Sequence, residues 1–146
     1  MIRNETSLQI ARPASEVFAF IDDESKTSRW LELCVSLRRV SDGPKGVGTH
    51  LHYVHREGGR NGEMQGVVTD YEPNRRLGMR YTDPMFDVLV DFWLAGENGG
   101  TALRHATEIT PKTFMGRIMG PLIGLAMRRQ MRKDTRTLRA LVEAGG

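Results

Sequence analysis

The fold of this chain is decided by residues 86–110, FDVLVDFWLAGENGGTALRHATEIT. A turn at 97–100 divides this stretch, and on each side of the turn most apolar side chains occupy every second position. Because side chains of a β-strand point to opposite faces in turn, each half of the stretch predicts a strand with one apolar face. The residues sharing that face are Phe86, Val88, Val90, Phe92 and Leu94 before the turn, and Leu103, His105, Thr107 and Ile109 after it.

Similar turn signals divide the chain before this hairpin, at 41–44, 58–59, 72–74 and 83–84. The segments between them have the length of strands. Such short connections favour antiparallel pairing, because parallel strands need long crossovers. The predicted strands are 6–10, 35–40, 49–57, 62–71, 76–81, 86–94 and 102–110.

Helices are predicted on both sides of this run of strands. Pro13 opens a short helix to about residue 22, and a second helical piece covers 25–33. The segment 111–144 has no strand-like alternation and predicts a long helix, in which Pro121 marks either a kink or the start of the long part. Glycines 116, 120 and 124 give it a smooth face, for close approach to the sheet or room for a ligand.

Length indicates a single domain, 1–146, and the pattern of strands and helices makes it an α+β domain. The 146 residues are 39% hydrophobic and 27% charged, near the globular average. The single cysteine, Cys34, excludes an intrachain disulfide. The N-terminal residues lack the apolar segment of a signal peptide, so we expect a cytoplasmic protein.

Several motifs give this order of elements a familiar form. They are residues 10–18 running on to Trp30, Gly46-Val47-Gly48-Thr49, the segment 71–77 (YEPNRRL), and Gly100-Thr101. The chain resembles the START-like, or SRPBCC, superfamily in its polyketide cyclase/dehydrase-like branch. That resemblance implies a helix-grip fold, a curved seven-stranded antiparallel sheet around a long C-terminal helix. It also implies a cavity between them for lipids, quinones, hormones or polyketides.

The face alternation and this resemblance together predict the lining of such a pocket. An apolar lining with a few polar groups is typical of ligand sites. The alternative is an ordinary filled core with no cavity. The predicted lining residues are Trp30, Leu51, Tyr53, His55, Met79, Tyr81, Phe86, Val88, Val90, Phe92, His105, Met115, Met119 and Leu122.

His105 is the leading candidate for acid–base chemistry, because it lies on the face predicted to be buried. Tyr53 or Tyr81 would be the second proton donor. The competing interpretation is a core histidine bonded to a backbone carbonyl or a water. His50 and His52 share one side of a strand but lack a third ligand, so no metal site is predicted.

Three functions therefore remain open. The first is binding or carriage of a small hydrophobic molecule, and the second is a cofactor-free polyketide cyclase or dehydratase. The third is an adaptor that docks through the basic segment 128–139, which otherwise forms a solvated helix face. We expect no cofactor and no nucleic-acid partner, peripheral membrane contact at most, and a monomer or homodimer.

Overall fold

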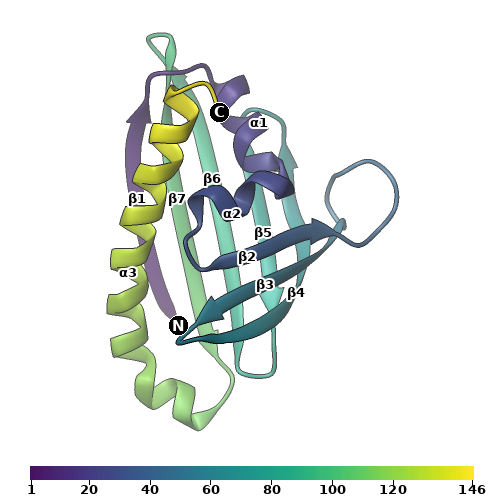
Figure 1. Cartoon of the computed structure of the whole chain (residues 1–146), viewed down its shortest axis with the longest axis vertical. Coiled ribbons are helices and arrows are strands. Elements are labelled where there is room, and N and C mark those ends of the chain that lie inside the picture. The colour runs from purple at the N-terminus through teal and green to yellow at the C-terminus, as the bar shows by residue number, and fades with distance from the viewer.

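A computed structural model describes all residues, 1–146, and shows a curved antiparallel sheet with helices on its inner side (Figure 1). The strands are β1 (Ile2–Ile10), β2 (Cys34–Arg39), β3 (His50–Glu57), β4 (Arg60–Glu72), β5 (Arg76–Thr82), β6 (Phe86–Glu97) and β7 (Gly100–Pro111). The helices are α1 (Ala14–Asp22), a 3-10 turn η1 (Glu24–Lys26), α2 (Thr27–Trp30) and α3 (Phe114–Glu143). The seven strands are ordered β1-β7-β6-β5-β4-β3-β2. The predicted helix-grip arrangement is confirmed.

The central hairpin of β6 and β7 has the register that the alternation predicts. Phe92 pairs with His105 and Leu94 with Leu103, on the face toward the helices. Asn98 and Gly99 connect the strands with φ values of 50° and 79°. Two consecutive positive φ angles are typical of the tight turns whose twist matches that of a hairpin.

The inner face of the sheet carries the hydrophobic core. Leu51, Leu77 and Leu103 are almost completely buried there, and Leu138 of α3 closes over them. α1 adds Val17 to the same cluster. In Figure 1, α1 and α2 lie over one end of the sheet, beside the C-terminal half of α3. We call this the covered end.

α3 packs mainly against β1, and it does so through glycine. Gly116, Gly120 and Gly124 are buried, and the last two lie against Ile2. The prediction of close approach to the sheet is therefore confirmed. Pro121 lies inside the helix rather than at its start, and Figure 1 shows the first turns bent away from the rest.

The expected position of three helix side chains is corrected. Met115, Met119 and Leu122 are 63%, 43% and 66% exposed, so they do not line an interior. The glycines occupy the inward side, and the large apolar residues between them point outward. None of the helices combines the length and the hydropathy of a membrane span.

Candidate functional site

The inner face of the sheet is less covered at the end away from α1 and α2. Five of its predicted lining residues are half-buried there: Tyr53, His55, Phe86, Val88 and Val90. They come from β3 and β6, on either side of Tyr81 of β5, which is buried. We call this region the half-buried end. It presents apolar surface that neither helix nor strand covers fully.

An aromatic cluster forms the floor of the half-buried end. The ring centroid of Tyr53 lies 5.5 Å from that of Tyr81 and 5.7 Å from that of His55, and the Tyr53 and His55 rings are stacked. Two glycines of β4 make room for the cluster. A Cβ atom on Gly62 would come within 2.6 Å of the His55 ring, and one on Gly66 within 2.6 Å of Tyr81. These glycines are not among the predicted site residues, and their signal in the sequence is their position on the inward side of a strand.

Both tyrosines of this cluster are neutral proton donors. Burial raises the pKa of Tyr53 and of Tyr81 above the ordinary tyrosine value. The Tyr81 hydroxyl donates to Met79 Sδ at 3.3 Å, a weak acceptor. His55 Nδ1 is buried without a hydrogen-bond partner. The half-buried end thus combines apolar walls with polar atoms that have weak partners or none.

His105 lies in a second cluster, at the covered end. Its ring stacks on Phe92 with centroids 4.4 Å apart, and Trp30 meets both rings edge-on. The Thr135 hydroxyl donates its only hydrogen to the Met131 carbonyl at 2.7 Å. It must therefore accept from His105 Nδ1, 3.3 Å away, which fixes the proton on that nitrogen.

Burial lowers the pKa of His105 to about 4, so the ring is neutral near pH 7. Its hydrogen-bond partner is a threonine hydroxyl, rather than the carbonyl or water of the competing interpretation. Trp30 is 4% exposed and packs in the core, with its indole Nε1 unpartnered.

The sheet register separates the two clusters. Tyr81 pairs with Val88 of β6, whereas His105 pairs with Phe92 of the same strand. Four residues along a strand span about 13 Å. The structure thus brings Tyr53, Tyr81 and His55 together and holds His105 apart from them.

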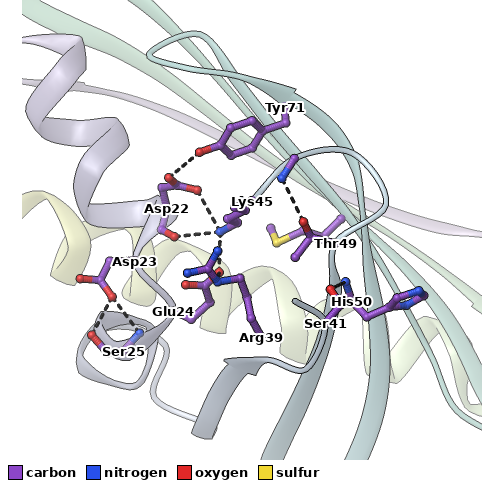
Figure 2. A network of polar contacts seen from close by, with 12 residues as sticks. Asp22, Asp23, Glu24, Ser25, Arg39, Ser41, Lys45, Thr49, His50 and Tyr71 are labelled. Carbon is purple, nitrogen blue, oxygen red and sulfur yellow. Dashed lines mark hydrogen bonds and ion pairs between the residues drawn. The ribbon is translucent and has the colours of Figure 1, made fainter. Parts of the chain in front are cut away.

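A polar network that the sequence analysis missed joins the β2–β3 loop to the helices (Figure 2). Lys45 Nζ lies 2.9 Å from both Asp22 Oδ1 and Glu24 Oε1, and donates to the Asp22 carbonyl at 2.8 Å. The Tyr71 hydroxyl donates to Asp22 Oδ2 at 2.8 Å, and burial next to this carboxylate raises the Tyr71 pKa to about 12. This network holds the loop over α1 and η1.

Two surface pockets lie outside the predicted lining. One of about 500 Å³ runs along β1, β6 and β7, with Leu8, Trp93 and Arg104 in its wall. The other, of about 430 Å³, lies between α1 and the end of α3. His50 is exposed and His52 half-buried, and no three His, Cys, Asp or Glu side chains are grouped as metal ligands would be.

Comparison with known proteins places this arrangement in a family. Residues 1–143 match the family described as polyketide cyclase / dehydrase and lipid transport. The chain belongs to this family. No curated protein matches the sequence itself. The polyketide cyclase/dehydrase family and its START relatives share the sheet, the long C-terminal helix and the two short helices described above.

Solved structures of this kind align over nearly the whole chain. The ZhuI aromatase/cyclase from Streptomyces sp. R1128 has a TM-score of 0.82 at 13% identity, covering 99% of this chain and 98% of that one. A START superfamily protein from Mycobacterium smegmatis has a TM-score of 0.82 at 14% identity, covering 99% of each chain. A protein from Thermus thermophilus has a TM-score of 0.81 at 16% identity, again covering 99% of each. At these identities the likeness concerns the fold alone.

Proposed function

We propose that this cyclase/dehydrase-family chain binds or carries a small hydrophobic molecule at the half-buried end of its inner face. The observation that carries the proposal is the incomplete burial of Phe86, Val88 and Val90 on a face that is otherwise a packed core. Apolar surface left in contact with water favours an apolar occupant by roughly 25 cal/mol for each Å² covered. The family's description, which includes lipid transport, supports the same class of ligand.

Polar atoms at this end would orient the ligand. Tyr53 and Tyr81 hold their hydroxyl protons, because burial raises the pKa of both. His55 adds a ring nitrogen that no protein group satisfies. A carbonyl or hydroxyl on an otherwise apolar molecule matches these groups, as in a quinone, an isoprenoid alcohol or a polyketide-like compound.

Native mass spectrometry of the purified protein tests this proposal, followed by extraction and identification of any bound compound. We expect one apolar compound in stoichiometric amount. Val90→Trp would fill the half-buried end and remove that compound. Val67→Trp is the matched control, because Val67 is a half-buried valine on the other face of the sheet. An empty wild-type protein whose binding of anilinonaphthalene sulfonate is unchanged by Val90→Trp would contradict the proposal.

A cofactor-free cyclase or dehydratase is the second candidate, favoured by one observation. His55 stacks on Tyr53 with centroids 5.7 Å apart, so a base and a neutral acid face the same surface. His105 suits this role less well, since it is buried at the covered end with its Nδ1 proton held by Thr135. His55→Phe should abolish cyclisation of a poly-β-keto substrate while ligand binding persists. Unchanged turnover would exclude this chemistry.

A further inference from the structure

One face of α3 is apolar and exposed along its N-terminal half. The side chains concerned are each 43% to 76% exposed. In a folded protein, large apolar residues that gather on one surface mark a contact with another apolar body. We call this set the apolar half of α3. It consists of Phe114, Met115, Ile118, Met119, Leu122 and Leu125.

The same face becomes cationic along the C-terminal half. Arg129, Arg132 and Arg136 continue the spacing of three and four residues that joins Ile118, Leu122 and Leu125, so they lie on the same side of the helix. All three arginines are exposed, and none has an acidic side chain within ion-pair distance. We call them the basic half of α3.

Neither half is balanced by neighbouring acids. Residues 112–133 contain no aspartate or glutamate, while Arg117 and Arg128 add further exposed, unpaired positive charge. Two lysines of this stretch are exceptions, since Lys112 pairs with Asp87 and Lys133 with Glu32. The opposite face of the helix packs against the rest of the protein, because Gly120 and Gly124 lie against Ile2 of β1, and Met131 and Leu138 are buried. The outward face is therefore free for a partner.

We propose that this outward face of α3 docks on an anionic lipid bilayer, with the apolar half in the interface and the basic half on the headgroups. A helix with apolar residues and unpaired arginines on one exposed face suits such a surface. A nucleic acid would use the arginines and leave the apolar half in water. A protein partner would need an acidic patch directly beside an apolar one, in the same order as the two halves of α3. An anionic bilayer satisfies both halves at once, and docking of α3 does not depend on what the inner face binds.

Flotation with lipid vesicles tests the proposal. We expect the protein to float with vesicles of phosphatidylcholine and phosphatidylglycerol, and not with phosphatidylcholine alone. Ile118→Ser with Leu125→Ser, and separately Arg129→Gln with Arg132→Gln, should each weaken binding by roughly tenfold or more. Added salt should weaken the wild type further, because surface charge is screened.

Matched variants control for loss of charge and of apolar surface elsewhere. Arg60→Gln with Arg75→Gln removes two exposed arginines, one at the start of β4 and one in the turn before β5. Val47→Ser removes an exposed valine of the β2–β3 loop. Both should bind vesicles as the wild type does.

Equal binding to neutral vesicles, or unchanged binding by both α3 double variants, would overturn the proposal. So would a dimer in sedimentation that Ile118→Ser with Leu125→Ser dissociates while vesicle binding persists. Native mass spectrometry of the same variants keeps ligand occupancy separate from docking.

Discussion

Gly124 lies directly against Ile2: a Cβ atom on the glycine would come within 2.7 Å of Ile2 Cγ2. The Gly124 carbonyl also accepts a hydrogen bond from Asn4 Nδ2 at 3.1 Å, and Asn4 is buried. The backbone of α3 thus rests on β1 through a contact that a larger residue would disturb.

A side chain at this contact should lower stability. Gly124→Val is expected to reduce the free energy of unfolding by about 1–3 kcal/mol, because overpacking outweighs the gain in helix propensity. Adding Ile2→Ala should recover part of that loss. Urea unfolding measures both, with Ala126→Val on the exposed side of α3 as the control. Equal effects of the two valine substitutions would mean that the contact is unimportant.

Acid should destabilise the protein partly through His105. Its folded pKa of about 4 is below the ordinary value of 6.5, so the native state binds fewer protons than the unfolded chain between these values. The stabilisation is complete above about pH 6.5 and falls as the pH drops toward 4. Between pH 7.5 and 4.5 the loss should be about 2–3 kcal/mol. In His105→Phe this part of the pH dependence should disappear. A parallel loss in both proteins would assign it to carboxylates instead.

Replacing Lys45 should cost more than replacing a surface lysine. Its side chain is 9% exposed, and the buried oxygens Asp22 Oδ1 and Glu24 Oε1 have no hydrogen-bond partner besides its ammonium group. Lys45→Met leaves two carboxylates side by side, with Arg39 Nε, 3.8 Å from Glu24 Oε1, as the remaining nearby cation. It should lower stability by about 2–4 kcal/mol in urea unfolding. Lys133→Met removes the exposed pair with Glu32 and should change little. Similar effects would show that burial does not strengthen the Lys45 network.

Cys34 should be almost inert while the protein is folded. It is 7% exposed, and burial raises its thiol pKa from 9.0 to about 11. The thiolate fraction near pH 8 should therefore fall by about a hundredfold, and alkylation is slowed at least as much. Iodoacetamide labelling with and without urea, followed by mass spectrometry, measures the ratio. Fast labelling of the native protein would indicate that β2 opens readily.

The strands could be predicted from the sequence because their physical cause is local. Each inner-face residue of β6 and β7 is followed by one that faces outward, and this alternation is visible in a single stretch. The N-terminal part of β1 escaped prediction, since its buried position is Asn4, whose partner is a backbone carbonyl in α3. The burial of a polar residue can be predicted only when the group that hydrogen-bonds to it, here far away in the sequence, is known.

The sequence indicated which strand residues face inward, but it did not indicate which of them lie close together. Tyr53, Tyr81 and His105 were all correctly placed on the inner face, yet sheet register puts His105 with Trp30 and the two tyrosines with His55. The inward side of α3 was misjudged for a different reason. Large apolar residues ordinarily mark the buried face of a helix, whereas here the smallest residues do so because the backbones approach closely.

The pairing of β1 with β7 also determines when the sheet can be completed during synthesis. Ile2 pairs with Ile109, and closing a contact between residues about a hundred positions apart is entropically slow. A nascent chain that has reached only β6 carries β1 with neither its partner strand nor α3. β2 through β6 can already form as a meander at that stage, whereas the edge strand must wait for the ribosome to deliver β7.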